Sequence, residues 1–561
     1  MVNVEEIRVG VFVCHCGSNI GGIIDCKKLA EYSRTLPSVV YSEDNLYTCS
    51  ENGLKSIKNA IKEHDLNRVV VASCTPRTHE PLFRDTIEEA GMNKYLFNFI
   101  NIRDQCTWVH SKSPNEAYRK AEDLVRMGVA KAVKLEPLED IVVDINHEAL
   151  VIGGGVAGMK AAVTLSKFGY KTYLIEKKRH LGGRLKSLYK VFPNDEKASE
   201  IMNDLVREIK DSDNIIVFYS SEIDKINGFI GNYDVYVKHS GNSENLKVGV
   251  IIVAVGSQVF KPIGIFGYDG KKRITQLELE KNLQNNEIDA KNVVMIQCVG
   301  AKNEKREYCS NVCCMTAMKN ALILKEKCSD INITILFRDL FTPGVVYEDY
   351  YNKSRENGIL FSRYTLENPP VVESDKVRVF NQSIGGLLEI PYDLLVLSTP
   401  MVANEDNSKL AQQLKVPLEK NKFFLEAHVK LRPVDFATDG IYIAGSAKWP
   451  VSIAESISQG LAAASRANTI LSHAQIEVEG ATATLPEWNK DLCKGCEVCI
   501  EICPYNAIKK NEDDEIIIIK ALCKGCGVCG ATCTKKAITI KHFTNEQINS
   551  EILALGGLEI K

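Results

Sequence analysis

Eight of the 19 cysteines stand near the end of the chain in two runs of C-x-x-C-x-x-C-x-x-x-C. This is the bacterial spacing for two [4Fe–4S] clusters, in which the fourth cysteine of each run binds the other cluster. We therefore predict one cluster on Cys493, Cys496, Cys499 and Cys533 and a second on Cys523, Cys526, Cys529 and Cys503. Such a pair of clusters passes single electrons. The alternative for the same residues is a pair of zinc knuckles.

A glycine-rich turn at residues 153–158 has the spacing of a dinucleotide-binding site. An apolar strand (149–152) leads into G-x-G-x-x-G, a helical pattern follows, and the next strand ends at an acidic residue. The glycines let the backbone approach a pyrophosphate, the helix N-terminus faces its charge, and the acid binds ribose hydroxyls. The predicted contacts in this segment are Gly153, Gly155, Val156, Ala157, Gly158, Glu176 and Lys177.

Later segments favour FAD over NAD as the dinucleotide. They are similar to those of two-dinucleotide flavoproteins, in the L-G-G-R that follows the acid, in the strand 251–256 and in the strand 440–445. The helix predicted over 452–467 would point its N-terminus, and its dipole, at the flavin. Ser446 replaces the Asp that is usual in those proteins, and its hydroxyl can still form a hydrogen bond. The contacts added here are Gly183, Arg184, Val255, Gly256, Gly445, Ser446 and Ile453.

A second strand–helix–strand unit carries cysteines where a nicotinamide dinucleotide would bind. The strand 292–297 is followed by no glycine fingerprint but by Cys298, Cys309, Cys313 and Cys314. We predict that this half-domain holds a [4Fe–4S] cluster next to the flavin in place of NAD(P)H, with unligated thiols as the alternative. Cys328, at the far end of the helix, is expected to be an ordinary buried thiol.

The first 140 residues alternate strands and helices, which is a doubly wound α/β pattern. Strands are predicted at 8–13, 39–41, 68–72 and 95–100, and helices at 26–35, 54–64, 83–90 and 116–133. Each strand is soon followed by a cysteine, and ligands of open α/β sheets bind at the carboxyl ends of the strands. We predict a cluster on Cys49, Cys74, Cys106 and either Cys14 or Cys16, with free thiols as the alternative. Cys26, inside a helical pattern, is interpreted as structural.

The predicted fold class is α/β. A two-dinucleotide, thioredoxin-reductase-like Rossmann flavoprotein core lies between an N-terminal doubly wound α/β domain and a C-terminal double-cluster ferredoxin domain. The expected boundaries are 1–140 for the N-terminal domain, 147–265 and 401–475 for the FAD-binding domain, 266–400 for the second Rossmann-like domain and 476–561 for the ferredoxin domain.

Composition agrees with a soluble protein of several domains. The 561 residues are 45% hydrophobic and 25% charged, with a net charge of −3 that gives no reason to expect nucleic-acid binding. No apolar run reaches the ~18 residues of a membrane span. Because Glu5, Glu6 and Arg8 interrupt the start, we expect no signal peptide. The expected location is cytoplasmic, where clustered cysteines are metal ligands or redox groups rather than disulfides.

Over its whole length the chain resembles the family of the A-type subunit of heterodisulfide reductase. The resemblance rests on V-C-H-C-G-S-N-I at 13–20, A-S-C-T-P-R at 72–77, N-I-R-D-Q-C-T-W-V-H at 101–110, Q-C-V-G at 297–300, Y-C-S-N-V-C-C-M at 308–315 and the two closing cysteine runs. Some members carry an extra ferredoxin module in the flavin domain. No cysteine lies between Cys106 and Cys298, so this chain is identified as a shorter form without it.

The resemblance implies an oxidoreductase subunit in which FAD accepts electron pairs and sends single electrons along two cluster chains. It also allows the reverse, confurcating direction, in which single electrons from two chains are combined on FAD. It implies as partners the other heterodisulfide-reductase-type subunits, a hydrogenase or formate dehydrogenase adaptor, and ferredoxin, with two copies in a larger complex. Four [4Fe–4S] clusters and one FAD are expected, and no catalytic acid–base residue is evident. Two alternatives stay open: an NAD(P)H-dependent enzyme resembling the glutamate synthase small subunit, and a non-catalytic wiring scaffold.

Overall fold

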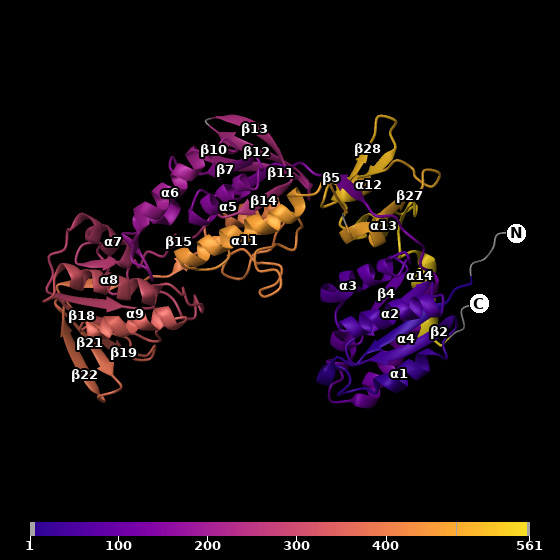
Figure 1. Ribbon diagram of the computed structural model, residues 1–561, viewed down its shortest axis with the longest axis horizontal. Coiled ribbons are helices and arrows are strands. Elements are labelled where there is room, and N and C mark those ends of the chain that lie inside the picture. The colour runs from indigo at the N-terminus through magenta and orange to yellow at the C-terminus, as the bar shows by residue number, and fades with distance from the viewer. Residues whose placement is uncertain (1–5, 240, 478, 558–561) are drawn as a thin grey trace. The chain divides into compact units, whose positions relative to one another are not determined.

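The computed structural model describes residues 6–239, 241–477 and 479–557. The chain divides into two compact units (Figure 1). One consists of Met1–Val142 together with Glu477–Lys561, and the other of Val143–Ile476. The first unit therefore joins the two ends of the chain, and the internal segment folds as the second.

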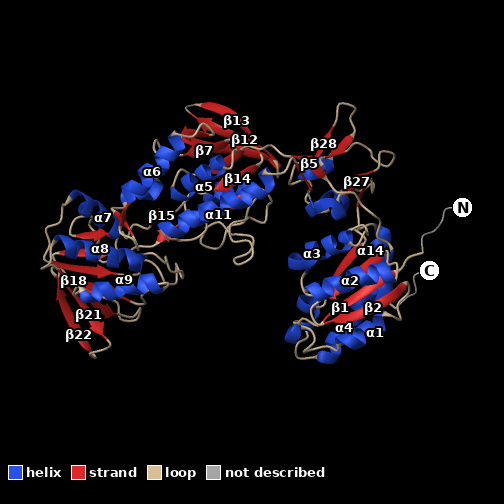
Figure 2. Ribbon diagram, in the orientation of Figure 1, coloured by secondary structure: helices blue, strands red, loops and turns tan. Residues whose placement is uncertain are grey.

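The N-terminal part of the first unit is a parallel sheet of order β2-β1-β3-β4. Its strands are β1 (Val9–Cys14), β2 (Val39–Asn45), β3 (Arg68–Ser73) and β4 (Phe97–Asn101). Its helices are α1 (Cys26–Ser33), α2 (Glu51–Glu63), α3 (Pro76–Glu89) and α4 (Pro114–Val133). Helices α1 and α4 contact each other, as do α2 and α3, so helices flank the sheet (Figure 2). Every residue of β1 and β3 is buried, as expected for a covered parallel sheet.

The C-terminal part of this unit repeats one small motif. Its strand pairs join β27 (Pro486–Trp488) with β30 (Ile538–Ile540) and β28 (Ile508–Lys510) with β29 (Ile516–Ile518). The short helices α12 (Val498–Glu501) and α13 (Val528–Thr532) contact each other. The last helix, α14 (Asn545–Leu555), packs on α4, where Arg126 Nε donates to the Ala554 carbonyl at 2.6 Å.

The second unit begins with a parallel sheet of order β10-β7-β6-β14-β25. The strands are β6 (Ala149–Ile152), β7 (Thr172–Glu176), β10 (Ile215–Tyr219), β14 (Val250–Val253) and β25 (Ile441–Ile443). One face is covered by α5 (Val156–Lys167), α6 (Ala198–Lys210) and α11 (Ile453–Leu471). The other is covered by the antiparallel strands β11 (Ser221–Phe229), β12 (Asn232–His239) and β13 (Asn242–Val248), with α10 (Asn407–Leu414).

A second parallel sheet in this unit has the order β16-β23-β17-β18-β19. The strands are β16 (Arg273–Thr275), β17 (Asn292–Ile296), β18 (Asn332–Phe337), β19 (Leu360–Arg363) and β23 (Leu394–Leu397). One face packs on α7 (Gln276–Asn285), α8 (Cys313–Lys327) and α9 (Val345–Glu356). The other packs on an antiparallel sheet of β20 (Val371–Val372), β21 (Lys376–Asn381) and β22 (Gly386–Pro391).

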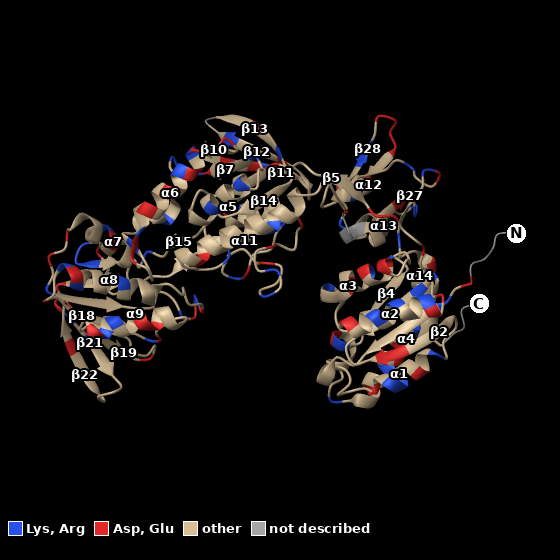
Figure 3. Ribbon diagram, in the orientation of Figure 1, with Lys and Arg blue, Asp and Glu red and all other residues tan. Residues whose placement is uncertain are grey.

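Charges of both signs are mixed along the helices, as α1 and α4 show (Figure 3). This mixture matches the small net charge of the chain, −3. Among the described helices, none is long and apolar enough to cross a membrane.

Candidate functional site

A cavity of about 710 Å³ opens at the carboxyl ends of β6, β7 and β14, within the usual range of about 300–1,000 Å³ for ligand pockets. Every predicted flavin contact except Gly158 lines it. These are Gly153, Gly155, Val156, Ala157, Glu176, Lys177, Gly183, Arg184, Val255, Gly256, Gly445, Ser446 and Ile453. The structure thus brings together residues from widely separated parts of the sequence, which a ligand with several separated groups would require.

The glycines form a cradle that side chains would fill. A Cβ atom on Gly158 would lie 1.9 Å from the Gly153 carbonyl oxygen, which explains why Gly158 contacts the turn and not the cavity. Gly153 has φ +111°, which favours glycine, and a Cβ atom on Gly183 would lie 2.9 Å from the Cα of Gly155. A Cβ on Gly155 would meet nothing within 4 Å, so this turn is open towards the cavity at the first residues of α5. Helix α5 has no side-chain cap, which leaves N–H groups for an anion.

Glu176, the predicted ribose ligand, has a carboxylate that first organises the glycine turn. Its two oxygens accept hydrogen bonds from the backbone N–H groups of Gly154 (2.8 Å) and Lys178 (2.7 Å). The side chain is buried but lines the cavity, and a carboxylate keeps further lone pairs for a hydroxyl donor. One residue therefore fixes the glycine turn and remains available to a ligand.

Two further polar features of the cavity fit a bound dinucleotide. Ser257 Oγ is buried without a hydrogen-bond partner in the described structure. Arg184 donates to the Ser257 carbonyl at 2.9 Å, and burial lowers the pKa of Arg184 to about 10. The N-terminus of α11 also reaches the cavity, capped by the reciprocal bonds of Ser452 and Glu455. Together with the glycine cradle, these groups fit FAD.

A buried ion pair in the wall of the cavity is absent from the sequence-based predictions. Lys319 of α8 lines the cavity, pairs with Glu280 of α7, and also donates to the Lys190 carbonyl at 2.8 Å. Burial lowers the pKa of Lys319, and Glu280 opposes that shift. The signal in the sequence is Lys319–Asn320, the only polar pair in the otherwise apolar stretch 317–324.

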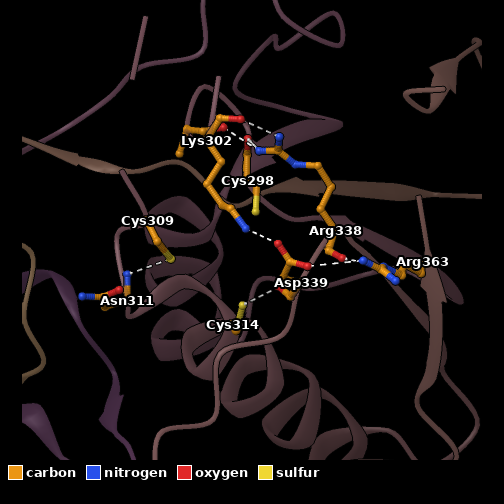
Figure 4. A network of polar contacts seen from close by, with 9 residues as sticks. Cys298, Lys302, Cys309, Asn311, Cys314, Arg338, Asp339 and Arg363 are labelled. Carbon is orange, nitrogen blue, oxygen red and sulfur yellow. Dashed lines mark hydrogen bonds and ion pairs between the residues drawn. The ribbon is translucent and has the colours of Figure 1, made fainter. Parts of the chain in front are cut away.

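The thiols of the second Rossmann-like half lie together near this cavity. Cys298 follows β17, Cys309 lies in the loop, and Cys313 and Cys314 form the first turn of α8. Burial raises the pKa of the Cys313 thiol, and the three other thiols raise it further, which places all four within electrostatic reach of one another. Figure 4 shows Cys314, whose Sγ donates to the Asp339 carbonyl at 3.7 Å, facing the same space as Cys298 and Cys309. Cys328 is exposed, so the expectation of a buried thiol is wrong.

The N-terminal thiols gather at the carboxyl edge of the first sheet, but in a different set from the predicted one. Burial raises the pKa of Cys49, and Cys14, Cys74 and Cys16 raise it further, so Cys14 and Cys16 are both members of the group. The strands are in register there, with Cys14 beside Asn45. Burial raises the pKa of Cys16, and Arg103, which hydrogen-bonds the Cys16 thiol, acts in the opposite direction and lowers it.

Cys106 departs from the prediction, because its side chain does not reach that edge. After β4 the chain turns through the π-helical segment η2 (Arg103–Thr107), which directs Cys106 inward. Its Sγ donates to the Ala117 carbonyl at 3.1 Å, and the residue is fully buried against α4. Burial raises the pKa of this thiol to about 11, and no other thiol contributes to the shift.

The C-terminal thiols fall into two neighbourhoods. Burial raises the pKa of Cys529 to about 11, with added contributions from Cys523, Cys526 and Cys503, so Cys503 lies with the second run. Cys499 lies with Cys493 and Cys496, which raise its pKa after burial. Backbone N–H groups donate to Cys503 and Cys533, each at 3.3 Å. Among the described residues, no three or more His, Cys, Asp or Glu side chains are grouped tightly enough to hold a metal ion, so the cluster ligands remain predictions.

Residues 147–300 match the family described as pyridine nucleotide-disulphide oxidoreductase, and residues 486–509 match the 4Fe-4S binding domain. The A-type subunit of the H(2):CoB-CoM heterodisulfide,ferredoxin reductase from Methanothermobacter thermautotrophicus is 37% identical over 98% of this chain and 97% of its own. A protein of Archaeoglobus profundus, described as like the A-type subunit of heterodisulfide reductase, is 33% identical over 98% of both chains. Among solved structures, thioredoxin reductase of T. acidophilum is similar at 16% identity, with a TM-score of 0.40, over 57% of this chain and 97% of its own.

Proposed function

This chain belongs to the family of the A-type subunit of heterodisulfide reductase, and from that premise we propose that it is the FAD- and iron–sulfur-dependent branching component of a soluble electron-transfer complex. The 4Fe-4S domain and the flavin-type fold agree with an oxidoreductase. The branching would be bifurcating or confurcating, between a hydrogenase or formate dehydrogenase module, ferredoxin and a disulfide-reducing partner. Two copies would form the core of the complex.

One observation carries this proposal, namely that Cys313 belongs to two sites at once. It lines the cavity that fits FAD, and it lies with Cys298, Cys309 and Cys314. Its Sγ donates to the Thr399 carbonyl, another residue of the cavity wall, at 3.6 Å. Bound FAD would supply the ability to exchange electrons both in pairs and singly. A cluster on these thiols would then adjoin the flavin with no pyridine nucleotide between them.

The chain's own residues would hold charge and protons in the cavity. Lys319 keeps a buried ammonium against Glu280, facing the cavity, and can donate a hydrogen bond to a polar atom of a ligand there. Buried, preorganised donors of this kind stabilise negative charge more strongly than solvent does. Apolar side chains, among them Val156, Ile223 and Leu277, also line the cavity.

The proposed cluster ligands in the N-terminal part follow the geometry. They are Cys14, Cys16, Cys49 and Cys74, without Cys106. With the Cys298 group and the two C-terminal groups, this gives four [4Fe–4S] clusters, or about 16 Fe per FAD. The N-terminal cluster would act as a further relay, and the C-terminal pair as a connection to a partner.

The full chain, purified without oxygen, tests this function. We expect about 16 Fe and one FAD, and flavin reduction by reduced ferredoxin that is not reproduced by NADH or NADPH. Cys313→Ser should remove about four Fe and slow that reduction, whereas Cys328→Ser, an exposed thiol just past the end of the same helix, should change neither. Rapid reduction by a pyridine nucleotide would support the glutamate-synthase-like alternative. Electron flow that survives Gly155→Trp without FAD would support the scaffold.

A further inference from the structure

Arg338 is a buried cation beside Cys298 that has no carboxylate partner in the described structure. It lies just after β18, is 9% exposed, and forms no ion pair among the described residues. Its guanidinium nitrogens donate to the carbonyls of Cys298 (3.4 Å), Ala301 (2.5 Å) and Lys302 (2.7 Å). Carbonyl oxygens accept these three hydrogen bonds but do not neutralise the charge. A buried charge without a counter-charge is costly, so this arrangement calls for an anion.

The adjacent residue, Asp339, carries a carboxylate that forms no ion pair with Arg338. That carboxylate is shared by the ammonium of Lys302 and, at 3.5 Å, the guanidinium of Arg363. Figure 4 shows these side chains around the Cys298, Cys309 and Cys314 sulfurs. Three cations therefore accompany one carboxylate at this group, which leaves positive charge beside the thiols.

One donor of Arg338 also remains available. Its Nε–H is buried with no hydrogen-bond partner in the described structure. The carbonyls of Cys298, Ala301 and Lys302 hold the guanidinium at this loop, so a fixed positive charge lies next to Cys298.

We infer that Arg338 is a positioning and redox-tuning residue for the iron–sulfur centre at Cys298, which it keeps easier to reduce by holding a fixed positive charge and an unpaired N–H next to that residue. The inference rests on the proposed cluster. Reduction adds one electron and one unit of negative charge to the centre, and no proton is needed. Net charge and hydrogen bonds to the sulfurs are established determinants of cluster potential. Electrons from the flavin side would then favour this centre.

The test compares the full chain with Arg338→Gln, Arg338→Lys and the matched exposed variant Arg363→Gln, which removes a cation 58% exposed at the same network. The readouts are iron content and the midpoint potential of the centre, followed by EPR in a redox titration and assigned by the signal that Cys298→Ser removes. We expect Arg338→Gln to retain its iron and to lower the reduction equilibrium constant at least about tenfold, which is about 59 mV for a one-electron couple. Arg338→Lys should shift the midpoint potential less, and Arg363→Gln should leave it almost unchanged.

The other outcomes are distinct. If the unmodified chain has no centre that depends on Cys298, the proposed cluster fails and the inference with it. If the centre is present and Arg338→Gln leaves its potential unchanged, the inference alone is wrong. Loss of about four Fe from both Arg338→Gln and Arg338→Lys would make Arg338 a structural support of the 298–302 loop, and would also overturn the tuning role.

Discussion

Lys319 and Glu280 form an ion pair that is almost completely removed from solvent, with side chains 2% and 0% exposed. The pair joins α8, which carries the Cys313 and Cys314 thiols, to α7, and it faces the flavin cavity through Lys319. A further hydrogen bond, from Lys319 to the Lys190 carbonyl, ties the pair to β8 (Lys190–Val191), which also lines the cavity. Packing of the two helices and the charge inside the cavity thus depend on one pair.

Removing one partner of this pair should be costly. We expect Lys319→Met to lower the free energy of unfolding by about 3–5 kcal/mol, because it leaves Glu280 buried without its counter-charge. The double variant Lys319→Met/Glu280→Leu should recover most of that loss. Urea denaturation measures both. If the double variant, loaded with FAD, is reduced by ferredoxin as fast as the unmodified chain, Lys319 has no role in the cavity beyond stability.

Substitutions at Gly158 and Gly155, two glycines of the same turn, should affect folding and flavin binding differently. Gly158→Ala places a Cβ 1.9 Å from a backbone oxygen, so overpacking should cost about 1–3 kcal/mol of stability and reduce FAD content. Gly155→Ala meets no atom within 4 Å and has an ordinary φ of −77°, so it should fold normally and still bind less FAD. FAD absorbance and thermal denaturation of both variants check this. Equal stability losses would contradict the packing argument.

The sequence predicts the order and type of the elements well because their signals are local. The buried runs at β1 and β3 and the turn between β6 and α5 lie close to the predicted positions. Helix α3 begins earlier than predicted, at Pro76 rather than Phe83, because Pro fits the first turn of a helix and the apolar face of α3 begins only later.

The features that the sequence does not predict depend on side-chain direction or on distant pairing. The π-helical turn after β4 points Cys106 into the core, and spacing alone cannot show this. The partnership of Lys319 with Glu280 joins residues 39 positions apart on two helices. Arg338 lies just past the end of β18, where no motif marks it.

The choice between Cys16 and Cys106 as an N-terminal ligand can be decided by iron analysis. Cys16→Ala should remove about four Fe per chain, because Cys16 lies with Cys14, Cys49 and Cys74. Cys106→Ala should keep all the iron and cost about 1–2 kcal/mol of stability through lost packing. Iron loss in Cys106→Ala with retention in Cys16→Ala would restore the set predicted from the sequence.

Alkaline conditions should weaken the first unit through Tyr95. Burial and the hydrogen bond to Asp140 raise the pKa of Tyr95 from 10.0 to about 12. Below about pH 10 the phenol is neutral in both states and contributes no pH dependence. Between about pH 10 and 12 the unfolded chain loses its proton first, so stability falls as pH rises, by up to about 1.4 kcal/mol per pH unit.

Tyr95→Phe removes the hydrogen bond, so its free energy of unfolding should be about 1 kcal/mol lower at neutral pH. Above about pH 10 its free energy of unfolding should fall less steeply with pH than that of the unmodified chain. Urea denaturation of both proteins at about pH 8, 10 and 11 gives the two slopes, and identical slopes would show that Tyr95 ionises normally in the folded protein.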